Sequence, residues 1–134
     1  MKDAKKLLEE KGISPSLQRV IILRYLMTHD NHPSTDEVYQ ALLEEIPTLS
    51  KTTIYNTLKL FSQKGIIHPL AIYGNELHYE TQQGYHGHFY CMECGRIFDL
   101  DIGEREEFPV ERDGHQIREK EVVFRGTCRH CRRD

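Results

Sequence analysis

Apolar positions recur at helical spacing along the first half of the chain. The segment 3–11 predicts a short helix that ends at Gly12. A second helix is predicted from a cap and first-turn proline at Ser14-Pro15 to about His29. Its apolar residues are spaced for one buried stripe, and they are Leu17, Val20, Leu23 and Met27.

The next two helices have clearer boundary signals. Residues 34–37 form a capping-box pattern, which opens a third helix that ends before Pro47. Ser50 caps a fourth helix that runs to about Lys64 and stops at Gly65. The fourth helix has one apolar face, formed by Ile54, Leu58 and Phe61. Its opposite face is a polar stripe of Thr52, Tyr55, Asn56, Lys59 and Gln63.

After the helices the pattern changes to that of strands. Residues 66–80 predict two short strands around a turn at Gly74-Asn75. Helices followed by a two-stranded ribbon are the order of a winged helix-turn-helix. Residues 81–134 then contain three strand-like runs, at 86–91, 96–102 and 121–128. We therefore expect an α+β chain with a winged-helix domain at 1–80, a hinge near 74–84 and a small α/β domain at 81–134.

Length and charge exclude several classes of protein. A chain of 134 residues is too short for a (β/α)₈ barrel, which needs about 250 residues. Its net charge of −3 argues against a protein that coats nucleic acid through bulk positive charge. The charge is uneven, however, because no acidic residue lies between Glu45 and Glu76, where three lysines do. An anionic partner is expected to bind there.

No part of the sequence predicts a membrane or an export segment. No window approaches the about 18–20 apolar residues of a membrane span, and the N-terminus lacks the apolar core of a signal peptide. We therefore expect a soluble cytoplasmic protein with no membrane partner.

The four cysteines form two C-x₂-C pairs, Cys91 with Cys94 and Cys128 with Cys131. Two such knuckles complete a tetrahedral sulfur shell for Zn²⁺. The alternatives are two disulfides or a redox pair. A cytosolic chain disfavours structural disulfides, and a thioredoxin-like site uses one C-x-x-C in a βαβ unit. Structural zinc is the favoured interpretation, because a segment of about 50 residues needs such a staple to fold.

A second metal site is indicated by His86-Gly-His88, on the strand that leads into the first knuckle. Side chains two residues apart on a strand share a face, and Gly87 leaves space between the imidazoles. Glu80 and Asp99 are nearby carboxylates, and such a shell suits Fe²⁺, Mn²⁺ or Zn²⁺. An isolated H-x-H pair is more often an ordinary strand feature, but the adjacent knuckle and carboxylates favour a metal site. Spacing alone gives no ligand role to the other histidines, which are His29, His32, His68, His78, His115 and His130.

The polar stripe of the fourth helix is either a solvated face or a recognition surface. It contains Tyr55, Lys59 and Asn56, whose amide can pair with adenine edges, and no acid lies near them. This combination favours a recognition helix in a DNA major groove.

Five motifs resemble the ferric uptake regulator (Fur) superfamily of metal-dependent bacterial repressors, and they cover nearly the whole chain. They are SLQR (16–19), NHPSTDEVY (31–39), LSKTTIYNTLKLF (49–61), GYHGHFYCMECGRIFDL (84–100) and GTCRHC (126–131). The resemblance implies an N-terminal winged helix, a C-terminal α/β dimerisation domain stapled by a Zn(Cys)₄ site, and a regulatory metal site between the domains. It also implies a homodimer on an inverted-repeat operator of double-stranded DNA.

The resemblance assigns residues to these sites. The regulatory ligands become His32, Glu80, His86, His88 and Asp99. Metal held by both domains would select the dimer shape whose recognition helices fit successive major grooves. The candidate DNA contacts are Arg19, Ser50, Lys51, Thr52, Thr53, Tyr55, Asn56 and Lys59.

The branch within the superfamily follows from three positions. Asp99 and Asn56 resemble the peroxide-sensing PerR branch, whereas Glu80 favours the others. In that branch Fe²⁺ reacts with H₂O₂ and a ligand histidine is oxidised, here His32 or His86, which releases metal and DNA. We favour a PerR-type repressor with Fe²⁺ or Mn²⁺ as corepressor. The alternative is an iron- or zinc-uptake regulator with reversible metal loss.

Other classes of function have less support, and the chain is not expected to be an enzyme. The chain contains neither H-E-x-x-H nor P-C-x-x-C, the motifs expected of a zinc hydrolase or deaminase. The interpretation as a plain zinc-ribbon interaction module does not explain the segment between Glu45 and Glu76, which has three lysines and no acidic residue. Three departures from the family pattern remain: the displaced Pro15, Lys120 where several relatives carry a further histidine ligand, and Pro109 within the dimerisation helix expected around 103–113.

Overall fold

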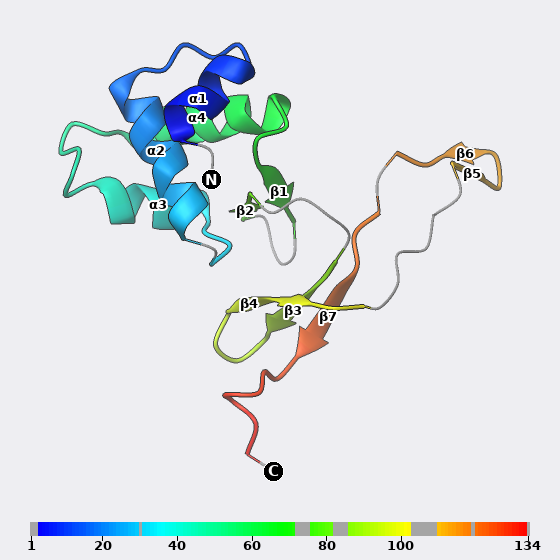
Figure 1. The fold of residues 1–134 in the computed structure, drawn as a ribbon. Coiled ribbons are helices and arrows are strands. Elements are labelled where there is room, and N and C mark those ends of the chain that lie inside the picture. Colours follow the sequence, from blue (N-terminus) through cyan, green and yellow to red (C-terminus); the bar gives the residue numbers. More distant parts are fainter. Residues whose placement is uncertain are drawn as a thin grey trace. The chain divides into compact units, whose positions relative to one another are not determined.

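The computed structural model describes residues 3–29, 31–71, 76–81, 86–102, 110–118 and 120–133. The chain divides into two compact units, Met1–Gln82 and Gln83–Asp134. All the described helices belong to the first unit, whereas the second is built from strands (Figure 1). The predicted α+β class is therefore confirmed. In the part of the chain described, no helix combines the length and apolar character that a membrane crossing requires.

Four helices form most of the N-terminal unit. They are α1 (Ala4–Glu10), α2 (Leu17–Thr28), α3 (Thr35–Leu42) and α4 (Lys51–Gln63). A polar side chain caps each helix by accepting a backbone N–H, and the caps are Asp3, Ser16, Ser34 and Ser50. At the start of α3, Ser34 Oγ accepts from Glu37 N at 3.1 Å, and the Glu37 carboxylate accepts from Ser34 N at 3.4 Å. The predicted capping box is confirmed.

The start of α2 differs from the prediction. The cap is Ser16 and not Ser14, because Ser16 Oγ accepts from Arg19 N at 3.3 Å, and Pro15 precedes the helix. Leu17 is therefore the first helical residue; it is 76% exposed and does not join a buried stripe. The buried residues of α2 are Ile22, Leu23 and Leu26. Val20 and Met27 are partly buried and pack against the core cluster to which these residues belong.

The apolar face of α4 lies in the core of this unit. Ile54, Leu58 and Phe61 are completely buried, as their spacing predicts. Full burial of each such side chain stabilises the fold by about 1.5–3 kcal/mol. Gly65 ends the helix with a φ of 74°, in the left-handed region that favours glycine. Burial of one face thus fixes which residues α4 exposes on the other.

Two strands follow α4 and form the predicted ribbon. β1 (His68–Leu70) pairs antiparallel with β2 (His78–Glu80), and the predicted turn at Gly74-Asn75 lies outside the described residues. β2 also pairs with the segment before α3 through a bridge from Ser34 to His78. This is the element order of a winged helix-turn-helix.

The C-terminal unit is built on a three-stranded sheet of order β4-β3-β7 (Figure 1). Its strands are β3 (Gly87–Cys91), β4 (Ile97–Leu100) and β7 (Val123–Gly126), which confirms the three predicted runs. β3 pairs antiparallel with β4 and parallel with β7. This register places Asp99 directly opposite His88.

The prediction of a dimerisation helix around 103–113 is wrong for its C-terminal end. Residues 103–109, with Pro109, lie outside the described residues. Glu111–Arg112 form strand β5, which pairs with β6 (His115–Gln116). Asp113 and Gly114 connect them with φ values of 52° and 83°. Positive φ at both positions is what an Asp-Gly hairpin turn adopts, so this turn overrides helix formation there.

Candidate metal centres and nucleic-acid interface

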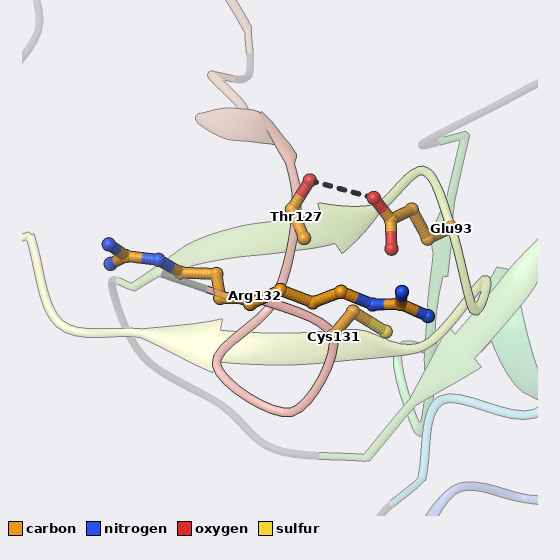
Figure 2. Close-up of a pocket in the computed structure, with 5 residues that line it drawn as sticks. Glu93, Thr127, Cys131 and Arg132 are labelled. Carbon is orange, nitrogen blue, oxygen red and sulfur yellow. Dashed lines mark hydrogen bonds between the residues drawn. The ribbon is translucent and has the colours of Figure 1, made fainter.

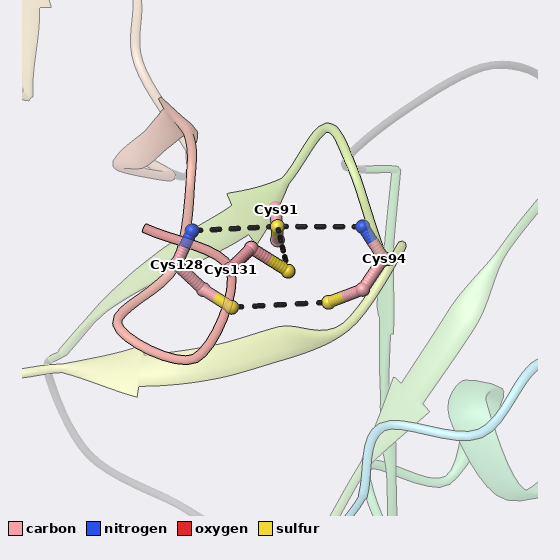
Figure 3. Close-up of side chains that lie close together, drawn as sticks. All are labelled: Cys91, Cys94, Cys128 and Cys131. Atoms are coloured by element: carbon pink, nitrogen blue, oxygen red, sulfur yellow. Dashed lines mark hydrogen bonds between the residues drawn. The ribbon is translucent and has the colours of Figure 1, made fainter. Parts of the chain in front are cut away.

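Four cysteine side chains gather beside the C-terminal sheet (Figure 3). Cys91 ends β3 and Cys94 lies in the turn after it, while Cys128 and Cys131 follow β7. All four Sγ atoms lie within 4.8 Å of one another. The Cys91–Cys131 and Cys94–Cys128 sulfur distances are 3.9 Å and 3.8 Å. These distances exclude disulfides, whose sulfurs are ~2.05 Å apart. They match the edge of about 3.8 Å in a tetrahedron with Zn–S bonds of ~2.3 Å.

Hydrogen bonds shift the pKa values of two of the thiols, Cys91 and Cys131, in opposite directions. The backbone N–H groups of Cys94 and Cys128 each donate to the buried sulfur of Cys91 at 3.4 Å. The Cys94 N–H in particular lowers the pKa of Cys91 to about 6. Hydrogen bonding to Cys128 raises the pKa of Cys131 to about 12. Four thiolates at this separation repel one another, and a divalent cation would remove that repulsion.

Protein contacts also join the two knuckles. Met92 N donates to Gly126 O at 2.8 Å, and the Thr127 hydroxyl donates to the Glu93 carboxylate at 3.3 Å (Figure 2). Glu93 and Thr127 also line an open cavity of about 610 Å³, together with Cys131, Arg132 and Arg133. The His130 ring lies 6.1 Å from the Phe98 ring and packs as an aromatic side chain.

His86, His88 and Asp99 converge on one face of the C-terminal sheet. His86 Nε2 lies 3.2 Å from His88 Nε2 and 3.4 Å from Asp99 Oδ1, and the third side of the triangle, from His88 to Asp99, is 3.7 Å. Two ligand atoms bound ~2.1 Å from one metal ion are about 3.0–3.4 Å apart at tetrahedral or octahedral angles. The triangle therefore has nearly the size that one divalent ion requires.

Gly87 does not act as a spacer between the imidazoles. A Cβ added at Gly87 would lie 2.7 Å from Ile102 Cγ2 and 3.4 Å from Leu100 O. Successive residues of a strand point to opposite faces, so this clash lies on the face away from the histidines. A side chain at position 87 would therefore force Ile102 to shift.

His32 and Glu80 form a second group, within the N-terminal unit. His32 Nε2 lies 3.4 Å from Glu80 Oε2, and the two side chains are only 3% and 6% exposed. A buried carboxylate requires a cation or strong hydrogen-bond donors beside it. His32 also has a φ of 50°, a left-handed conformation that costs a non-glycine residue about 1–3 kcal/mol and clusters at functional sites.

His78, which the sequence pattern left without a role, contacts this group. Its Nδ1 donates to His32 O at 2.8 Å. Next to it, Tyr79 N donates to Pro33 O at 2.9 Å. The available sequence signal was the position of His78, two residues before Glu80 and therefore on the same face of the strand.

The polar stripe of α4 is exposed. Tyr55 is 51% exposed, which is unusual for a large aromatic side chain. The other exposed residues of the predicted interface are Ser50, Lys51, Thr52, Asn56 and Lys59. Thr53 is half-buried, and its hydroxyl lies 2.9 Å from Ser50 Oγ.

Two predicted DNA contacts already have partners in the N-terminal unit. Lys51 Nζ lies 2.8 Å from Asp36 Oδ1, which raises the pKa of Lys51, and 5.7 Å from the Tyr39 ring centroid. Arg19 Nη1 donates to Ser14 O at 2.9 Å. Each cation thus already has an oxygen partner within the N-terminal unit.

Comparison with known proteins gives a consistent result. The model of the Ferric uptake regulator family matches residues 10–124. The peroxide-responsive repressor PerR of Staphylococcus aureus (strain Mu50 / ATCC 700699) is 33% identical over 129 residues, covering 92% of this chain and 86% of the relative. The ferric uptake regulator of Francisella tularensis with iron aligns with a TM-score of 0.73 at 25% identity, over 91% of this chain and 96% of that one. PerR from Streptococcus pyogenes aligns with a TM-score of 0.56 at 25% identity, over 98% and 95%. The chain therefore belongs to the ferric uptake regulator family.

Proposed function

We propose that this chain is a metal-dependent transcriptional repressor of the peroxide-responsive PerR type. The observation that carries the proposal is the triangle of His86, His88 and Asp99. Two histidines and one carboxylate with open positions are the ligand set of many non-haem Fe²⁺ sites. The 33% identity to PerR of Staphylococcus aureus supports the same function.

We propose two metals with different roles. The four cysteines hold a structural Zn²⁺, and their filled shell has no position for the reactive water of a zinc hydrolase. The regulatory ion is Fe²⁺ or Mn²⁺, with Zn²⁺ as an alternative. It is held jointly by His86, His88 and Asp99 and by His32 and Glu80. Either group alone has fewer ligands than the about six positions of an octahedral shell.

We propose that the protein is a cytoplasmic homodimer. Its N-terminal unit supplies the DNA contacts. α4 enters the major groove, where Tyr55 and Asn56 meet base edges and Lys59 meets a phosphate. Residues 50–53 at the N-terminus of α4, with Arg19, meet the DNA backbone. In an inverted-repeat operator the two α4 helices occupy half-sites about 34 Å apart. Metal favours the protein conformation that fits this spacing because that conformation binds the ion more tightly.

Loss of repression follows from damage to the ligands. Fe²⁺ held by these ligands would supply the redox chemistry by which one oxygen atom of H₂O₂ is added to a ligand imidazole and the other leaves as water. His32 and His86 are the proposed targets. An imidazole that has gained oxygen is a poorer ligand, so metal affinity falls and DNA affinity falls with it.

Peptide mass spectrometry tests the proposal. The protein loaded with Fe²⁺ and exposed briefly to dilute H₂O₂ is expected to gain one oxygen atom on the peptide containing His32 or His86. A sample loaded with Mn²⁺ serves as control and should gain none. Unmodified histidines in both samples would contradict a PerR-type sensor. That outcome would favour an iron- or zinc-uptake regulator with reversible metal loss, the alternative that Glu80 favours.

Tyr55→Ala is expected to weaken specific DNA binding by about 1–3 kcal/mol, or roughly 5- to 150-fold, because Tyr55 is exposed in the middle of the recognition face. Binding is measured by fluorescence anisotropy, with a duplex selected from a random pool on Mn²⁺-loaded protein. Gln63→Ala, at the far end of the same face, is the matched control. An equal loss on a scrambled duplex would show that Tyr55 does not read sequence.

A further inference from the structure

Every residue of β2 contacts the loop that precedes α3. His78 Nδ1 donates to His32 O at 2.8 Å, and Tyr79 N donates to Pro33 O at 2.9 Å. Glu80 Oε2 lies 3.4 Å from His32 Nε2. Because side chains alternate along a strand, His78 and Glu80 share one face while Tyr79, 3% exposed, enters the core on the other. β2 therefore holds His32 at two points, its carbonyl and its imidazole.

His32 has a backbone conformation that requires such support. Its φ of 50° lies in the left-handed region, which side chains other than glycine adopt at a cost. The following residue is Pro33, and steric contact with a proline ring pushes the preceding residue toward extended backbone. Two local effects thus oppose the observed conformation, which persists only where the surroundings fix it. The hydrogen bond from His78 acts directly on the His32 peptide unit.

We propose that His78 is a positioning residue that keeps the His32 imidazole in place for metal binding and so sets the affinity for the regulatory ion. The inference rests on the proposed function, in which His32 and Glu80 are ligands of that ion. A backbone carbonyl only accepts hydrogen bonds, so Nδ1 of His78 carries the donated proton. His78 acts through His32, to whose carbonyl its Nδ1 donates.

The test compares side chains at position 78 that differ in where they carry a donor. His78→Asn places an amide nitrogen at the same number of bonds from the backbone as Nδ1 of histidine. His78→Leu has the same shape as the asparagine variant but no hydrogen-bond donor. His78→Gln keeps a polar amide but moves it one bond farther out. His29→Leu is the matched control, because His29 Nδ1 makes a like bond to Tyr25 O at 3.0 Å.

Mn²⁺ affinity of the zinc-loaded full chain is measured by electron paramagnetic resonance of the free ion. Bound zinc and the thermal unfolding midpoint are measured on the same samples. We expect the Leu and Gln variants to bind Mn²⁺ about ten-fold or more weakly, as losses of ligand-orienting partners do. The Asn and His29→Leu variants should stay close to the parent, and zinc should be unchanged throughout.

Parent-like Mn²⁺ affinity in the Leu or Gln variant would overturn the proposal. An equal loss of Mn²⁺ affinity in the Asn variant would also overturn it, because the shape of the imidazole ring, and not the donated hydrogen bond, would then determine the affinity. The Gln variant decides the matter if the Leu variant does not fold. A parent chain that binds no metal beyond its zinc would overturn the proposed function itself, which separates the two failures.

Discussion

Cys94→Ser is expected to release the zinc and unfold the C-terminal unit. Among the described apolar residues of that unit, the buried ones are Cys91 and Cys128, both in the knuckles, whereas the main core cluster lies in the N-terminal unit. The unit therefore buries little apolar surface of its own. A structural zinc site binds with an apparent free energy of about 10–16 kcal/mol, which is as large as the whole stability of a typical domain.

The expected loss is measured as zinc per chain and as the loss of strand signal and of the C-terminal unfolding transition. Cys94 is exposed, so the substitution itself disturbs no packed side chain. Met92→Ser, at an exposed position of the same knuckle, is the matched control and should retain zinc. Retention of zinc and of the unfolding transition in Cys94→Ser would contradict a structural role for the cluster.

Local signals explain why much of the fold was predictable. The Ser34 capping box and the Ser50 cap act within four residues, so the starts of α3 and α4 agree with the sequence prediction. The spacing of Ile54, Leu58 and Phe61 defines a face directly, and all three are buried. The C-x₂-C pairs likewise specify short turns, whose sulfurs the sheet brings within 4.8 Å.

Errors arose where local signals competed or where contacts were distant. Ser14 and Ser16 both flank Pro15, and sequence alone favoured the wrong serine as the cap of α2. The Asp113-Gly114 hairpin was missed because the family resemblance favoured a helix there. The spacing along the strand places His78 on the same face as Glu80, but it does not report the bond to His32, which lies 46 positions away.

His86→Ala is expected to abolish metal-responsive DNA binding and to leave the zinc in place. The substitution removes one corner of the ligand triangle and leaves His88 and Asp99, whose ligand atoms are 3.7 Å apart. Loss of a direct ligand should lower metal affinity by more than the about 10- to 100-fold that loss of a ligand-orienting partner causes. The Mn²⁺ dependence of binding to the selected duplex measures the effect.

His115→Ala, at an exposed position on β6 of the same unit, is the matched control and should respond to Mn²⁺ like the parent. A His86→Ala protein that still required Mn²⁺ to bind DNA would place the regulatory ion elsewhere. The comparison with Cys94→Ser is informative because the four cysteines and the triangle of His86, His88 and Asp99 belong to one small unit. If zinc maintains the fold and the second ion controls DNA affinity, the cysteine variant loses both properties, whereas the histidine variant keeps the fold and loses only the response.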